Sequence, residues 1–407
     1  MNNAVLNPEL NTMAIGLGKK TRRAYGFDEI ALVPAGNTLD VELCSTSWEI
    51  GGFKFEVPII ASAMDSVVSP GNASVLASQG VMPVLNLLGV YTRYEDYSKV
   101  LLEMCAADKT EFVELMQKIY KEPIKKELIA KVIKQIKASY TDKSKPVVVS
   151  IAPYMANEYG PVVEEAGADI LVIQSTVVGL EHKAYKAKPG YDPRSELNLE
   201  AFCKQSKIPV VVGNCVDYNI AIQLMRTGIA GLLVGIGPGA ACTSRGVLGI
   251  GVPMATAIAD CRQARDDYFQ ESGCYVPIIG DGGMNIGGDI CKALACGADA
   301  VMIGSPFART EEAPARGYHW GMATPSPVLP RGTRIQVGTD CSVHELIHGP
   351  ARRDDGSQNL LGAIKTCMAT LGAETLKELQ DVEVIIAPSI LTEGKVYQQA
   401  QKLGMSR

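Results

Sequence analysis

The sequence predicts a (β/α)8 barrel, in which eight parallel strands close into a ring and a helix follows each strand. Eight short apolar or β-branched runs alternate with stretches of helical spacing along the 407 residues. Most of these runs are continuously apolar, as expected for strands that are buried on both faces. Several helical stretches end in a glycine that leads directly into the next strand, such as Gly167, Gly228 and Gly297. Glycine is the usual residue just past the end of a helix.

The predicted strands are spread over most of the chain. A doubly wound open sheet is the alternative fold, but no strand–GxGxxG–helix unit opens the sequence. The strands are expected, in order, at residues 57–62, 81–86, 147–152, 169–174, 208–213, 231–236, 276–281 and 299–304.

Three segments fall outside this alternation. Residues 1–35 read as an irregular lead-in with a basic cluster. Residues 94–145 are rich in lysine and glutamate with apolar residues at helical spacing, which predicts a small helical insertion between strands two and three. Residues 312–340 are rich in proline, glycine and arginine and predict a structured loop over the barrel mouth. The expected division is a catalytic barrel of residues 1–93 and 146–380, a helical insertion of 94–145 and a C-terminal tail of 381–407.

The composition is that of a globular protein, with 47% hydrophobic and 20% charged residues. The net charge of −5 is mild and argues against a broad nucleic-acid-binding surface. No run approaches about 18 consecutive apolar residues, and the N-terminal stretch lacks an apolar signal core, so neither a membrane span nor an export signal is expected. The eleven cysteines are odd in number and irregularly spaced, which indicates reduced thiols in a cytoplasmic protein.

Candidate functional residues follow the predicted strands, where barrel enzymes carry their chemistry. Residues 232–252 run from strand six into a glycine-rich turn that carries Cys242. A cysteine in such a turn is predicted to be a nucleophile rather than a packed core thiol. Glycines after strands seven and eight suit a phosphate, and Asp281 suits the hydroxyls of a ribose. The groups at the strand ends are Ser62-Ala63-Met64-Asp65, Gln174-Ser175-Thr176, Gly213-Asn214-Cys215, Gly235–Ser244, Asp281-Gly282-Gly283 and Gly304-Ser305.

A zinc-protease pattern, HExxH, occurs at residues 344–348. The helix that carries it is expected to end at once, at Gly349-Pro350. The remaining histidines, His182 and His319, do not have the spacing of a third ligand. A zinc site at His344 and His348 is therefore not favoured.

The motifs GIGPGAACTSR, PIIASAMDSVV, IIGDGGMNIGGDICKALACGADAVMIGS and FDEIALVP together resemble the IMP dehydrogenase/GMP reductase family, over roughly residues 20–380. The insertion, the stretch WGMATPSPVLPRGTR and the tail resemble one subgroup of it. The resemblance implies that a cysteine thiolate, here Cys242, attacks purine C2 of a nucleoside monophosphate and forms a covalent thioimidate. Hydride is then exchanged with a nicotinamide cofactor.

The resemblance also implies roles for residues around Cys242. Ser244 stands beside it where a catalytic threonine is usual. The backbone carbonyls of Gly237, Gly239 and Cys242 match a potassium loop. The substrate would be held by Asp281 at the ribose, by Gly283, Gly304 and Ser305 at the phosphate, by Ser62, Met64 and Met322 at the purine, and by Asn214 near the reacting base. The cofactor would lie against Gln174, Ser175 and Thr176.

The sequence departs from the family pattern at several of these positions. Ala240 replaces a serine that usually helps to bind phosphate. Gln174 replaces an aspartate expected near the nicotinamide ribose. Arg331 and Gly332 fall where reductases carry a glutamate and dehydrogenases carry a glutamine or glutamate.

The direction of the reaction is predicted from the lack of a clear counterpart to the flap that hydrolyses the intermediate. An IMP dehydrogenase hydrolyses its intermediate with a mobile flap that carries an Arg-Tyr pair, and Arg316-Gly317-Tyr318 has the residue types at a different spacing and position. A GMP reductase needs no hydrolysis, so an NADPH-dependent GMP reductase is favoured. An NAD-dependent IMP dehydrogenase and a non-catalytic regulator that binds purine nucleotides remain the alternatives. The resemblance implies a homotetramer or a homo-octamer with GMP or IMP as ligand.

Overall fold

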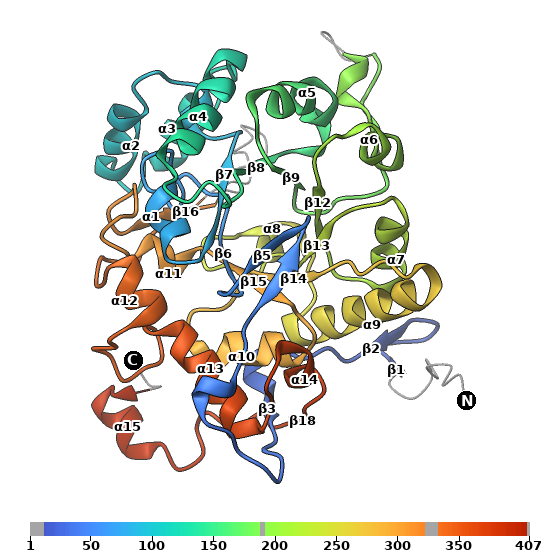
Figure 1. Ribbon diagram of the computed structural model, residues 1–407, viewed down its shortest axis with the longest axis vertical. Helices are drawn as coiled ribbons and strands as arrows, with labels where there is room; N and C mark the ends of the chain where they lie inside the picture. The colour runs from blue at the N-terminus through green and yellow to red at the C-terminus, as the bar shows by residue number, and fades with distance from the viewer. Residues whose placement is uncertain (1–11, 188–191, 322–332, 405–407) are drawn as a thin grey trace.

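The computed structural model describes residues 12–187, 192–321 and 333–404. Eight parallel strands close into a barrel, and helices surround it (Figure 1). The strands are β6 (Ile59–Ala61), β7 (Met82–Asn86), β8 (Val148–Ile151), β9 (Ile170–Gln174), β12 (Val210–Cys215), β13 (Gly231–Val234), β14 (Ile278–Asp281) and β15 (Ala300–Ile303). The predicted (β/α)8 barrel is confirmed. Seven of the predicted runs contain one of these strands, and the fifth run, 208–213, overlaps β12, which begins and ends two residues later.

The barrel closes where its first and last strands meet. β6 pairs in parallel with β15 on one side, through Ile60 and Met302, and with β7 on the other, through Ile60 and Met82. Nearly every side chain of the eight strands is buried. Burial on both faces explains why these strands read as continuous apolar runs.

The helices form the outer layer. Several begin and end at the residues that the sequence signals: Asp217 caps one helix by accepting from the N–H groups of Asn219 and Ile220, and Gly167, with φ of 90°, ends another. The helices that follow the strands are α1 (Ala73–Ser78), α4 (Lys126–Ser139), α5 (Ala156–Ala166), α6 (Leu199–Gln205), α7 (Tyr218–Arg226), α8 (Ser244–Leu248), α9 (Met254–Ser272), α10 (Gly287–Ala295) and α11 (Ser305–Ala308). The helices near the C-terminal end are α12 (Val343–His348), α13 (Leu360–Leu371), α14 (Leu376–Leu379) and α15 (Val396–Gln401). Within the described parts of the chain, no helix is both long enough and apolar enough to span a membrane.

The segment between β7 and β8 holds three helices, which gather at the upper left of Figure 1. They are α2 (Tyr97–Ala106), α3 (Phe112–Ile119) and α4. α4 contacts α1 and α5, so it occupies the place of the barrel's own helix between these two strands. Its apolar stripe, which includes Val132 and Ile133, is buried there. The surplus over one helix per strand is therefore α2 and α3.

The lead-in contains regular structure rather than being irregular throughout. It holds the hairpin β1 (Thr12–Ala14) and β2 (Lys20–Arg22), then β3 (Ile30–Leu32), which pairs with β18 (Val384–Ile386) from the predicted tail. The hairpin β4 (Trp48–Ile50) and β5 (Phe53–Phe55) precedes the first barrel strand and buries Trp48 and Phe55. The short elements that remain are β10 (Glu181–His182), β11 (Leu197–Asn198) and the 3₁₀ turns Phe27–Glu29, Val41–Leu43, Val90–Thr92, Pro153–Met155 and Pro193–Ser195.

The segment after β15 forms an antiparallel pair, β16 (Tyr318–Trp320) and β17 (Arg334–Gln336). Arg334 ties this pair to the surplus helices. Its guanidinium donates to the carbonyls of Cys105 and Ala107 at 3.0 and 2.6 Å, and lies 4.7 Å from the ring centres of both Phe112 and Tyr318. Met322 and Arg331, which the sequence analysis singled out, lie outside the described residues.

Removing the guanidinium of Arg334 should weaken the attachment of the β16–β17 pair to α2 and α3. We expect Arg334→Ala to lower the free energy of unfolding by about 2–4 kcal/mol, because several charge-assisted hydrogen bonds and two cation–π contacts are lost. Urea unfolding monitored by circular dichroism measures this. The exposed Lys118 on α3 provides a control: Lys118→Ala should change stability by no more than about 0.5 kcal/mol. Equal effects of the two variants would contradict the role of Arg334.

Candidate functional site

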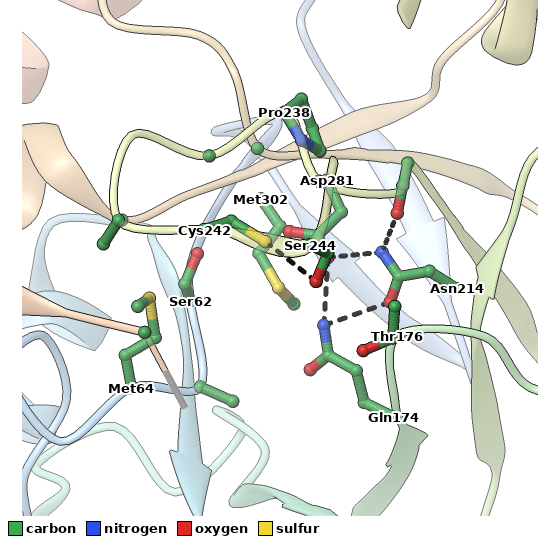
Figure 2. Close-up of a pocket in the computed structure, with 18 of the residues that line it drawn as sticks. Ser62, Met64, Gln174, Thr176, Asn214, Pro238, Cys242, Ser244, Asp281 and Met302 are labelled. Atoms are coloured by element: carbon green, nitrogen blue, oxygen red, sulfur yellow. Dashed lines mark hydrogen bonds between the residues drawn. The ribbon is translucent and has the colours of Figure 1, made fainter. Parts of the chain in front are cut away.

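A cavity of about 410 Å³ opens at the C-terminal ends of the strands. Every barrel strand or the loop after it contributes to the wall. The predicted site residues found on this wall are Ser62, Met64, Gln174, Ser175, Thr176, Asn214, Gly237, Gly239, Cys242, Ser244, Asp281, Gly283, Gly304 and Ser305. The structure therefore brings together residues that lie far apart in the sequence (Figure 2).

The loop after β13 presents the candidate nucleophile. Gly235 has φ of 143°, and a Cβ there would lie 2.5 Å from the Asp281 carbonyl oxygen, so only glycine allows this approach. The N–H of Cys242 donates to the Gly239 carbonyl at 2.9 Å, which turns the chain just before α8. The Cys242 side chain is exposed, and its thiol donates to Ser244 Oγ at 3.4 Å. The other exposed cysteine, Cys274, is not on the cavity wall.

Arg245 holds the two ends of this loop together, a role that sequence reasoning missed. Its guanidinium donates to the carbonyls of Ile236 and Val252, both at 3.1 Å. Its side-chain stem packs on two glycines: a Cβ at Gly237 would lie 2.6 Å from Arg245 Cγ, and one at Gly251 would lie 2.9 Å from it. The only sequence signal was an arginine inside a glycine-rich stretch.

A hydrogen-bonded cluster surrounds Asp281 at the end of β14. Its Oδ2 accepts from Asn214 Nδ2 at 2.6 Å and from Gln174 Nε2 at 2.9 Å, as the dashed lines in Figure 2 show. Asn214 Nδ2 also donates to the Gly235 carbonyl at 2.6 Å. Burial raises the pKa of Asp281 to about 6, although both amide donors favour the charged form. The amide of Gln174, expected at the cofactor, is thus engaged with the candidate ribose acceptor.

The loops after β14 and β15 form the glycine-rich corner of the cavity. Gly283 has φ of 79°, and a Cβ there would lie 2.8 Å from the ring of Pro238, so this turn packs directly on the cysteine loop. Gly304 and Ser305 follow β15 at the start of α11. The cavity-lining residues that the structure describes include no lysine or arginine.

Ser62 and Met64 lie on the loop after β6, and buried Asp65 anchors that loop. Asp65 Oδ2 accepts from the Val90 N–H at 2.8 Å and from the Tyr120 hydroxyl at 2.7 Å, and burial raises the pKa of this carboxyl to about 6. Trp320 Nε1 donates to the same Tyr120 hydroxyl at 3.2 Å. The loop is therefore connected to the end of α3 and to β16, which sequence reasoning did not anticipate.

The histidines of the HExxH pattern lie away from the cavity. His344 Nδ1 is 2.9 Å from Gln79 Oε1, and His348 Nε2 is 3.0 Å from the Gln79 carbonyl. Across the described ranges, no group of three or more His, Cys, Asp or Glu side chains is placed to hold a metal ion.

The cavity wall also has groups suited to a potassium ion and to a nicotinamide cofactor, the two ligands that the resemblance implies besides the substrate. Backbone carbonyls at Gly237, Gly239 and Cys242 are oxygen ligands of the kind that hard cations take, and although Gly239 already accepts one N–H, a carbonyl oxygen has two lone pairs. Uncharged polar side chains at Ser175 and Thr176 border the side of the cavity next to β9 and suit a nicotinamide ribose.

The loop clamp gives a testable expectation. Arg245→Met keeps the packed stem but loses both hydrogen bonds, so the local stability of residues 236–252 should fall by about 1–2 kcal/mol. Amide hydrogen exchange in that segment should then be about 5–30 times faster. Lys183→Met, an exposed change that is not on the cavity wall, is the control and should leave exchange there unchanged. Unchanged exchange in Arg245→Met would contradict the clamp.

Comparison with known proteins finds relatives that match most of the chain. The family model described as IMP dehydrogenase / GMP reductase domain matches residues 24–324. An uncharacterized oxidoreductase of Mycobacterium tuberculosis is 38% identical, covering 91% of this chain and 99% of the relative. An inosine-5'-monophosphate dehydrogenase of Thermoplasma acidophilum is 35% identical, over 54% of this chain and 44% of that protein. The crystal structure of an IMP dehydrogenase/GMP reductase-like protein from Corynebacterium glutamicum matches with a TM-score of 0.85 at 34% identity, covering 92% of this chain and 98% of the other.

Proposed function

The chain belongs to the IMP dehydrogenase/GMP reductase family, and we propose that it is an oxidoreductase that acts at C2 of a purine nucleoside monophosphate through Cys242. One observation carries the proposal: the exposed Cys242 thiol shares a single cavity with the carboxyl of Asp281 and with the Gly304-Ser305 turn. Covalent attack on a nucleoside monophosphate requires a nucleophile, an acceptor for the ribose hydroxyls and hydrogen-bond donors for the phosphate. The cavity volume of about 410 Å³ lies in the range of small-ligand sites.

The ribose would be held by Asp281. Both amide donors reach Oδ2 of this carboxyl, and its Oδ1 receives no hydrogen bond from the described residues. Oδ1 is therefore the oxygen that accepts from the ribose hydroxyls. The phosphate would then lie at Gly283, Gly304 and Ser305, and the purine between Met64 and Cys242.

The chemical step begins at Cys242. Its sulfur attacks purine C2 as a thiolate, and a C2–S bond forms. In GMP the C2–N bond then breaks, and the amino group leaves as ammonia after it takes up a proton. A bound NADPH would supply the hydride that C2 accepts. The C2–S bond then breaks, which releases IMP and returns Cys242 to the thiolate. Ser244 Oγ, 3.4 Å from the sulfur, orients the thiol and exchanges its proton.

GMP reduction is the direction we propose. Oxidation of IMP requires hydrolysis of the covalent intermediate, and so a mobile group that activates water. The Arg316-Gly317-Tyr318 stretch is poorly suited to this, because Tyr318 is held in β16 and stacks on Arg334. The carbonyls of Gly237, Gly239 and Cys242 would hold a potassium ion, and the protein would assemble as a homotetramer or homo-octamer.

IMP dehydrogenase is the second candidate. It is favoured by the relatives named inosine-5'-monophosphate dehydrogenase, such as those of Thermoplasma acidophilum and Pasteurella multocida, at 35% and 32% identity. This chain covers 44% of the length of each of those two proteins.

The two directions are separated by one pair of assays. Purified protein is mixed with GMP and NADPH, or with IMP and NAD, and nicotinamide absorbance is followed. We expect turnover of GMP. Turnover of IMP alone would replace reduction by oxidation, and stabilisation by nucleotides without turnover in either assay would favour a non-catalytic regulator.

Removing the nucleophile should separate binding from chemistry. Cys242→Ala should lower kcat by at least about a thousandfold while nucleotide binding stays within about threefold, because covalent catalysis is lost but the ribose and phosphate contacts remain. Calorimetry with GMP checks binding. Cys274→Ala, the exposed cysteine outside the cavity, is the matched control. Near-normal turnover in Cys242→Ala would refute the thiolate mechanism.

Nucleotide affinity should fall as the pH drops through about 6. The charged carboxylate of Asp281 accepts from the ribose, and its pKa is raised to about 6, so protonation below that pH removes the acceptor. One pH unit lower, affinity should be about tenfold weaker. The nucleotide phosphate also titrates near this pH, so calorimetry is run in parallel on Asp281→Asn. If the wild type and the variant show the same pH dependence, Asp281 is not the group responsible.

A further inference from the structure

His319 is a buried side chain on the cavity wall that the chemistry above does not use. It lies in the middle of β16 and is 3% exposed. A Cβ placed on Gly304 would lie 3.1 Å from His319 Cε1 and 3.2 Å from Nε2. The edge of the ring that carries Nε2 therefore borders the glycine corner to which the phosphate is assigned.

A hydroxyl fixes the orientation of this ring. His319 Nδ1 is 3.0 Å from Oγ of Ser66, which is itself fully buried on the loop after β6. A serine hydroxyl can donate to Nδ1, which places the ring proton on Nε2. Burial lowers the pKa of His319 to about 4, so the ring is neutral at pH 7 and Nε2–H is available as a donor.

The charge of the cavity gives this donor a purpose. Among the described residues on the wall, Asp281 is the one carboxylate, and neither lysine nor arginine is present. His319 is the basic side chain of that described wall. From these described residues, a phosphate monoester can receive hydrogen bonds but no ion pair with lysine or arginine, and hydrogen bonds to a charged acceptor are among the strongest in proteins.

We propose that His319 Nε2–H donates a hydrogen bond to the 5'-phosphate of the bound nucleotide at the Gly304-Ser305 turn, with Ser66 as the positioning residue for the ring. This inference rests on the proposed function, because it needs a nucleoside monophosphate in the cavity. It assigns the selection of nucleotides over nucleosides in part to β16, an element outside the barrel strands.

The test compares ligands that differ only in the phosphate. Dissociation constants of GMP and guanosine, and of IMP and inosine, are measured by calorimetry or competition for the full chain. In His319→Leu we expect the nucleotides to bind about 10–100 times more weakly, because a hydrogen bond to a charged group is lost. Nucleoside binding should stay within about threefold. A role confined to packing would weaken both members of each pair equally.

Further variants keep the test decisive if the leucine variant fails to fold, which its melting curve shows. His319→Gln retains an N–H donor and should recover most of the nucleotide affinity. Ser66→Ala should weaken nucleotides alone by about 3–10 times, because the ring is no longer fixed. His182→Leu changes an exposed histidine outside the cavity wall and should alter neither pair.

The outcomes separate this inference from the proposed function. If the wild type binds neither GMP nor IMP, the proposed function fails and this inference fails with it. If the wild type binds nucleotides and the His319 and Ser66 variants show no selective loss, the inference alone is overturned.

Discussion

Closure of the barrel between β6 and β15 is the constraint that assembles the site. The pairing of Ile60 with Met302 joins strands at opposite ends of the barrel sequence. It brings the loop that carries Met64 against Gly304, where a Cβ would lie 3.1 Å from the Met64 sulfur. The residue proposed to flank the purine and the turn proposed to bind the phosphate are therefore adjacent only because the ring is closed. An open sheet with the same strands would leave them on opposite edges.

The cavity itself is sparsely charged, and the buried titratable groups around it have shifted pKa values. Burial raises the pKa of Asp281 and Asp65 to about 6 and lowers that of His319 to about 4. A carboxyl whose pKa is higher in the folded than in the unfolded state reduces stability at neutral pH. For Asp281 this loss accompanies a candidate ligand contact. For Asp65, whose Oδ1 has no hydrogen-bond partner among the described residues, it accompanies the anchoring of the Met64 loop.

The strands and their polar ends could be predicted because both leave local signals. A strand buried on two faces reads as an apolar run, and the residue after it is a candidate for the site whatever lies elsewhere in the chain. The roles of Arg245 and His319 escaped prediction because they depend on partners reached through the fold. Asp65 was expected among the groups at the strand ends, but it lies off the cavity wall and anchors the loop instead. His319 meets Ser66 across more than 250 positions of sequence, a contact that no spacing rule reveals. The place of α4 in the barrel layer likewise depended on packing against α1 and α5.

Contacts of Arg334 and Trp320 join the β16–β17 pair to α2 and to the end of α3. Through the hydroxyl of Tyr120, this group of elements also contacts Asp65 on the loop that carries Met64. A chimaera between this protein and a relative should therefore exchange α2 and α3 together with β16 and β17. A transplant of residues 94–122 alone would carry the carbonyls of Cys105 and Ala107 without Arg334, and the Tyr120 hydroxyl without Trp320. The segments that must be exchanged together are therefore those that contact each other in the fold, although most of the barrel sequence separates them.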